Sequence, residues 1–135
     1  VKELLKYGKV IVSAEDIVPE EFQNLITDFP RDKMHDLLAF ASLYVGEGTT
    51  MASESCVLGT PAILTNTLDL GYLRDLQQRE LMIISVDSET VISNIRKIFN
   101  NPESSSIFRE RANQFITESQ SLTDILLHEI IKYID

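Results

Sequence analysis

The residues with the clearest potential for chemistry lie at positions 45–54, where a short apolar run leads through two glycines into a helix-forming segment. When a strand passes through a turn directly into a helix, the first backbone N–H groups of the helix point outward, with the helix dipole behind them. A helix start of this kind is suited to hold a phosphate or diphosphate. The candidate contact residues are Gly46, Glu47, Gly48, Thr49, Thr50 and Met51.

The same spacing also fits a turn with no ligand. Glycine permits backbone conformations that other residues avoid, and threonine is a frequent N-cap residue. This combination is therefore common wherever a strand enters a helix. The segment has neither the G-x-G-x-x-G fingerprint of dinucleotide sites nor the lysine of a P-loop. At this point both the functional and the structural interpretation remain open.

Glu54 adds a second feature to this segment. It follows Thr50 by four residues, so both side chains project from the same face of the helix. A carboxylate repels phosphate, but it accepts hydrogen bonds from the hydroxyl groups of a ribose. An acid this early in a helix also interacts favourably with the helix dipole, and the residues alone do not separate the two roles.

The rest of the chain predicts the elements that would position this segment. Short apolar runs at 9–13, 25–29, 42–45, 61–65 and 82–86 indicate strands, and helical spacing indicates a helix in each interval after residue 32. Two further helices after Asn101 carry continuous apolar faces. Alternating strands and helices favour an α/β fold, with a Rossmann-like parallel sheet flanked by helices and a helical carboxyl-terminal tail.

Composition narrows the possible partners. The 135 residues suit one domain, and 12 basic against 21 acidic side chains give a net charge of −9, which disfavours a nucleic-acid partner. No apolar run is long enough for a membrane span. The single cysteine, Cys56, fits a cytoplasmic protein. No histidine, cysteine and carboxylate spacing matches a metal site, so we expect neither metal nor cofactor.

Two blocks, 26–38 and 46–63, resemble the carboxyl-terminal domain of glycosyltransferase-B-fold proteins. The second block reads GEGTTMASESCVLGTPAI, and its part up to Pro61 is the specific one. The chain is similar to the N-acetylglucosaminyltransferase of peptidoglycan synthesis and to the UDP-N-acetylglucosamine 2-epimerases. It looks most like an uncharacterised archaeal and bacterial branch of these proteins, and the resemblance runs in order along nearly the whole chain.

This resemblance implies a role for each part of the two blocks. The turn at Gly48 to Met51 would receive the diphosphate of a nucleotide sugar, most simply a UDP-sugar. Glu54 matches the acid that holds the ribose hydroxyls, and Phe29 and Pro30 match the loop whose backbone faces the base. Residues 58–61 match a structural corner between helix and strand.

The resemblance also implies that something is missing. In the family this domain begins with a strand before its first helix, whereas this chain starts inside that helix. We therefore expect residues 1–135 to form a nucleotide-sugar-binding domain without its first strand and without the partner amino-terminal domain. The full protein would be a glycosyltransferase or an epimerase, the fragment alone would be inactive, and exposed surfaces would favour a homodimer. The alternative is a non-catalytic module for sugar-nucleotide binding or assembly.

Three further residues are weaker candidates. His35 lies early in the helix that precedes the turn and could act as a general base, although a lone histidine there is more often a surface residue. Asp69 and Tyr72 follow the 61–65 strand, where such folds place sugar contacts, but polar loop residues are usually only solvated.

Overall fold

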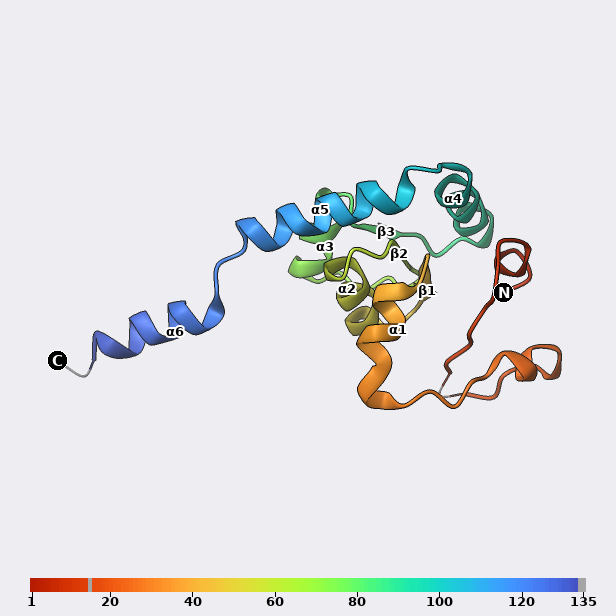
Figure 1. Cartoon of the computed structure of the whole chain (residues 1–135), viewed down its shortest axis with the longest axis horizontal. Coiled ribbons are helices and arrows are strands. Elements are labelled where there is room, and N and C mark those ends of the chain that lie inside the picture. The colour runs from red at the N-terminus through yellow and green to blue at the C-terminus, as the bar shows by residue number, and fades with distance from the viewer. Residues whose placement is uncertain (15, 134–135) are drawn as a thin grey trace.

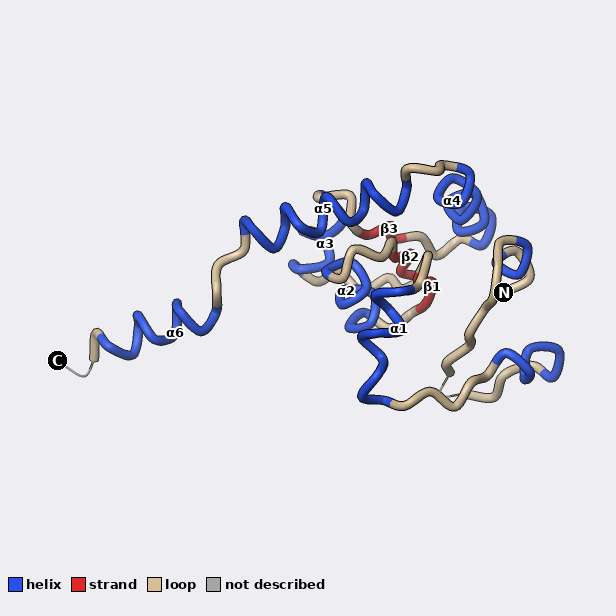
Figure 2. Tube along the Cα trace, viewed as in Figure 1, coloured by secondary structure: helices blue, strands red, loops and turns tan. Residues whose placement is uncertain are grey.

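The structure, a computed structural model, describes residues 1–14 and 16–133. Its centre is a parallel sheet in the order β1-β2-β3, formed by Tyr44–Gly46, Ala62–Leu64 and Met82–Ile84 (Figures 1 and 2). Tyr44 is opposite Ala62 in the register, and Ala62 is opposite Met82. Because all three strands run in the same direction, their carboxyl ends meet at one edge of the sheet.

Helices surround this sheet and follow the predicted order along the chain. The α-helices are α1 (Met34–Phe40), α2 (Thr49–Val57), α3 (Gly71–Gln78), α4 (Ser88–Asn100), α5 (Ser104–Glu118) and α6 (Leu122–Ile131). Short 3-10 segments, η1 (Leu4–Lys6), η2 (Glu20–Leu25) and η3 (Arg31–Lys33), precede them. The prediction of an α/β fold with a parallel sheet is confirmed.

The two faces of the sheet carry separate cores. All three residues of β2 are fully buried, and their side chains alternate between the faces. Ala62 and Leu64 pack toward α2, α3 and α5, in a cluster with Ala52, Cys56, Leu73, Leu76 and Ala112. Ile63 packs on the other face with Ile95 and Ile98 of α4 and with Leu4 and Tyr7 from the start of the chain. The sheet is thus covered on both sides, as a parallel sheet requires.

The two earliest predicted strands, at 9–13 and 25–29, are wrong as members of this sheet. The structure has only an isolated parallel bridge there, between Val12 and Ile26. Val10, Ile11 and Val12 are half-buried, and Ile26 is exposed. Their β-branched side chains favour extended backbone, but a strand also needs a neighbour along its length, and the bridge supplies a single point of pairing.

A corner between α2 and β2 fixes α2 in place. Gly59 has a φ of +82°, a left-handed conformation that glycine adopts without strain. The buried hydroxyl of Thr60 donates a hydrogen bond of 2.8 Å to the carbonyl oxygen of Leu38, near the end of α1. This corner therefore joins α1, α2 and β2, and its role within the fold is structural.

The last helix, α6, extends away from the body of the molecule (Figure 1). It has no buried residue, and the exposed fractions of its large apolar side chains and of Tyr133 run from 42% for Ile125 to 86% for Tyr133. By contrast, α5 buries Phe108 and Ala112 against the body. In the part of the chain that the structure describes, no helix combines the length and apolarity needed to cross a membrane.

Candidate functional site

The turn between β1 and α2 lies at the carboxyl end of β1, as the sequence predicted. Gly48 occupies the N-cap position of α2 and has no side chain to cap the helix, and the first backbone hydrogen bond of the helix runs from Ala52 N to Gly48 O at 3.0 Å. Among the residues that the structure describes, no side chain caps this end of the helix. The N–H groups of Thr49, Thr50 and Met51 therefore precede the helical hydrogen-bond ladder, and they can donate to a ligand or to water.

The two glycines of the turn have a packing reason of their own. A Cβ atom at Gly46 would lie 2.6 Å from the hydroxyl oxygen of Tyr44, and one at Gly48 would lie 3.2 Å from the same atom. The Tyr44 hydroxyl donates a hydrogen bond of 3.3 Å to Gly48 O. Burial of this phenol raises its pKa, so it stays protonated as a donor. The glycines thus make room for Tyr44 whether or not a ligand binds.

The turn is also tied to the loop that follows β2. Thr65 N donates to Gly46 O at 2.9 Å, and the Asn66 side-chain amide donates to Glu47 O at 3.2 Å. Asn66 Oδ1 in turn accepts from Leu68 N at 2.9 Å, which holds the amide in this orientation. The Glu47 carboxylate itself is exposed. Glu47 thus takes part in the turn through its backbone.

Glu54 and His35 come together beside this turn. The imidazole Nε2 of His35, the second residue of α1, lies 3.4 Å from Oε2 of Glu54 in α2. Helices α1 and α2 pack side by side, which explains the approach. The two side chains remain accessible, with exposed fractions of 67% for His35 and 37% for Glu54.

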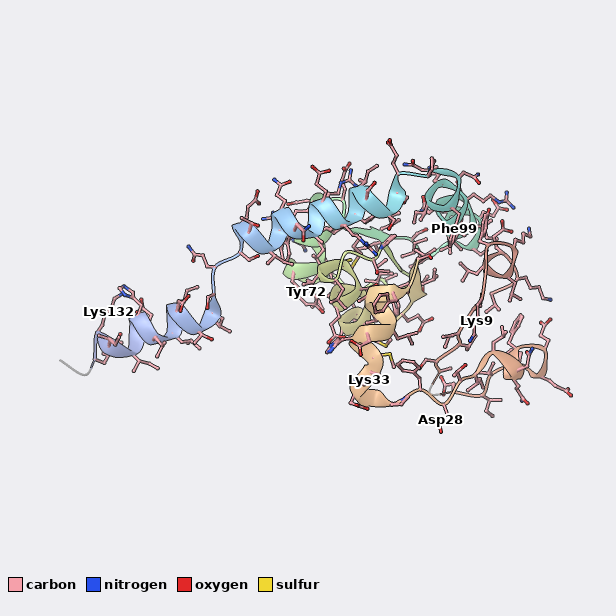
Figure 3. All side chains as sticks on the ribbon, in the orientation of Figure 1. Lys9, Asp28, Lys33, Tyr72, Phe99 and Lys132 are labelled. Carbon is pink, nitrogen blue, oxygen red and sulfur yellow. The ribbon has the colours of Figure 1, made fainter. Side chains whose placement is uncertain are left out.

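Phe29 and Pro30 lie just before η3, which leads into α1. Phe29 is half-buried and Pro30 is exposed. Pro30 O accepts a hydrogen bond of 2.9 Å from Lys33 N, which starts the η3 turn. Figure 3 labels Asp28 and Lys33, which bracket this pair at the foot of α1. The structure thus places Phe29 and Pro30 on the segment that carries His35.

Asp69 and Tyr72 contribute less than the sequence allowed. Both carboxylate oxygens of Asp69 accept hydrogen bonds from the Arg74 guanidinium, and this interaction lowers the pKa of Asp69. Tyr72 is the second residue of α3, and about half of its surface is exposed. Asp69 therefore already has an ionic partner within its own loop and helix.

A hollow of about 280 Å³ lies elsewhere, at the amino end of β3. Its lining residues are Gln77, Glu80, Met82, Ile83, Phe108 and Arg111. Arg111 donates to the carbonyl oxygen and the carboxylate of Glu80, so the charges at its rim neutralise each other. This hollow and the β1–α2 turn lie at opposite ends of the strands. In residues 1–14 and 16–133, no group of three histidine, cysteine or acidic residues could hold a metal ion.

Two residues that support the turn, Tyr44 and Asn66, are not among the candidates that the sequence predicts. In the sequence Tyr44 has only the pattern of a strand residue, and Asn66 belongs to no motif. One signal could have identified Asn66: it follows β2 directly, at the edge of the sheet where β1 also ends.

Comparisons of the chain with protein-family models, with curated proteins and with solved structures gave no match.

Proposed function

We propose that the chain binds a nucleotide-activated sugar, a UDP-sugar, at the β1–α2 turn, as the donor-binding part of a glycosyltransferase- or epimerase-like protein. The observation that carries this proposal is the uncapped start of α2, at the carboxyl end of a parallel strand, with Glu54 one turn along the same helix. Ligands of open α/β sheets bind at this edge, and helix starts bind phosphate groups.

The dimensions of α2 suit the two polar parts of such a ligand. A rise of 1.5 Å per residue places Glu54 about 6 Å along the helix axis from Thr50. A diphosphate at the N–H groups of Thr49, Thr50 and Met51 would thus leave its ribose near the Glu54 carboxylate. The family resemblance adds that the base would lie toward Phe29 and Pro30. In a transfer reaction, the helix start would stabilise the diphosphate as it leaves.

Titration of the isotope-labelled chain with UDP tests this proposal. We expect the amide signals of residues 49–54 to shift at millimolar UDP or below. Unshifted signals for these residues would refute nucleotide binding at the turn.

A variant of Glu54 separates ribose recognition from phosphate recognition. Glu54→Ala should weaken UDP binding by about 1.5–3 kcal/mol, the range for a hydrogen bond to a charged group. Pyrophosphate binding should stay unchanged or tighten slightly, because a negative charge near the anion is removed. Glu110→Ala, at an exposed position of α5, is the matched control and should change neither ligand. Equal losses for UDP and pyrophosphate in Glu54→Ala would mean that the substitution disturbs α2 itself.

A further inference from the structure

We propose that His35 forms a hydroxyl-binding pair with Glu54, and that this pair selects ligands that carry a ribose diol. The inference rests on the proposed nucleotide-sugar function, and it adds a specificity-determining residue from a second helix. His35 would contact the ligand directly, as the donor partner of the Glu54 acceptor.

The two side chains lie close together without a direct hydrogen bond of normal length. His35 Nε2 and Glu54 Oε2 lie 3.4 Å apart. A well-formed N–H···O hydrogen bond is about 2.9 to 3.0 Å long, so the two groups face each other without a tight direct bond. A hydroxyl oxygen that bridges them at about 2.8 Å with a near-tetrahedral angle needs them about 4.6 Å apart, so one of the two side chains turns outward by about 1 Å to admit it. Since both side chains are partly exposed, a ligand can reach this position from solvent.

The pair combines one hydrogen-bond donor with one acceptor. A neutral imidazole with its proton on Nε2 donates one hydrogen bond, and an ionised carboxylate only accepts. A hydroxyl group accepts from the imidazole and donates to the carboxylate at the same time. A phosphate oxygen has no proton to give to Glu54 and is repelled by its charge. The pair therefore matches a hydroxyl and disfavours a phosphate at the same position.

The other charged residues near His35 interact with each other. Lys33 Nζ lies 3.6 Å from Asp36 Oδ2, so these two neighbours of His35 interact with each other. The His35 imidazole approaches the carboxylate of α2 instead. Because the donor and the acceptor come from two packed helices, the spacing of the pair depends on the α1–α2 contact, which the Thr60 hydroxyl secures through Leu38.

Calorimetric titration of the whole chain with four ligands tests the inference. The ligands are UDP, 2′-deoxy-UDP, 3′-deoxy-UDP and pyrophosphate. His35→Leu should weaken UDP binding about tenfold, equivalent to about 1.4 kcal/mol, and His35→Gln should restore most of the loss because its amide keeps a donor. The deoxy analogue that lacks the bound hydroxyl should bind equally weakly to all three proteins. Pyrophosphate should bind them equally well.

The outcomes distinguish a failure of this inference from a failure of the proposed function. His128→Leu, at an exposed histidine of α6, is the matched control and should leave all four affinities unchanged. UDP affinity that depends on Glu54 but not on His35 overturns the inference alone. A His35→Leu loss that is equal for UDP, both deoxy analogues and pyrophosphate also overturns it, since the imidazole would then serve the phosphates or the fold. No binding of UDP by the unaltered chain overturns the proposed function and the inference together.

Discussion

Replacement of Gly59 by alanine should destabilise the corner that holds α2, for two reasons that the structure separates. The first is conformational: a φ of +82° costs a residue with a Cβ atom about 1–2 kcal/mol. The second is steric: the added Cβ would lie 3.0 Å from Arg109 Cγ and 3.1 Å from Arg109 Cα. The Cα atom belongs to the backbone of α5, so no side-chain rotation relieves this contact, and overpacking adds about 1–3 kcal/mol.

Together these effects predict a loss of about 2–4 kcal/mol in the free energy of unfolding, once the lower entropy of the unfolded alanine chain is allowed for. Urea denaturation followed by circular dichroism measures it. Gly71→Ala is the matched control, because no atom of residues 1–14 and 16–133 lies within 4 Å of its added Cβ and Gly71 is helical. Asn tolerates the left-handed region, so Gly59→Asn should recover the conformational part but not the steric part. A loss below about 0.5 kcal/mol for Gly59→Ala would contradict both the left-handed conformation of Gly59 and the contact of α5 with this corner.

Three further predictions concern other parts of the molecule. Hydrogen bonds from Arg96 and then Lys6 lower the pKa of Glu3 to about 2 from its ordinary value of 4.5. The stabilisation from these interactions is therefore complete above pH 4.5 and lost as the pH falls toward 2. Arg96→Leu should therefore reduce the dependence of the urea midpoint on pH across this range, and an unchanged pH dependence would contradict the prediction. Burial raises the pKa of the Cys56 thiol to about 12, so a disulfide reagent should label Cys56 only as the chain unfolds in urea, and rapid labelling of the folded chain would refute the packing around it. The exposed apolar surface of α6 should make the chain self-associate, and Leu126→Glu with Ile130→Glu should abolish the association in sedimentation equilibrium; a strictly monomeric unaltered chain would contradict this.

The middle of the chain could be predicted because local and long-range signals agree there. Residues 61–65 are apolar, and a glycine corner precedes them, which identifies a buried strand. The sequence offers Asp87 or Ser88 as the cap of the helix that follows β3, and the structure shows that Asp87 takes this role by accepting a hydrogen bond of 2.8 Å from Thr90 N. At both positions the local residue pattern agrees with the packing: β2 is apolar and buried between helices on both faces of the sheet, and the Asp87 cap is a contact within four residues.

The early part of the chain could not be predicted as well, because strand formation depends on a neighbour. Residues 9–13 have strong β-propensity, yet propensity mostly reflects packing against adjacent strands. Only Val12 finds a partner, Ile26, and the segment remains irregular. The sequence pattern is the same for a paired and an unpaired segment, so the difference appears only in three dimensions.

The candidate site also has one part that local sequence predicts and another part that it does not. Residues 46–54 are contiguous, so the turn and the placement of Glu54 follow from strand-to-helix geometry. Two contacts join residues from different elements, and no local sequence pattern predicts them. These are the contacts of Asn66 with Glu47 and of His35 with Glu54. The sequence allows His35 to be a general base or a surface residue, and the structure adds the carboxylate of Glu54, which lies 3.4 Å from its Nε2.

These cross-element contacts bear on how the turn would receive a ligand. Tyr44 supports the turn through its hydrogen bond to Gly48 O, while Thr65 and Asn66 hold it from the β2 side. The turn therefore does not have to fold around an anion, and the N–H groups at the start of α2 keep their outward direction in its absence. Donors fixed in advance stabilise a developing charge more than donors that must reorganise, because the cost of orienting them is met during folding. A packing role of Gly46 and Gly48 is therefore compatible with a phosphate-binding role of the turn. A turn held in place by packing binds a phosphate more effectively, because its donors are already oriented.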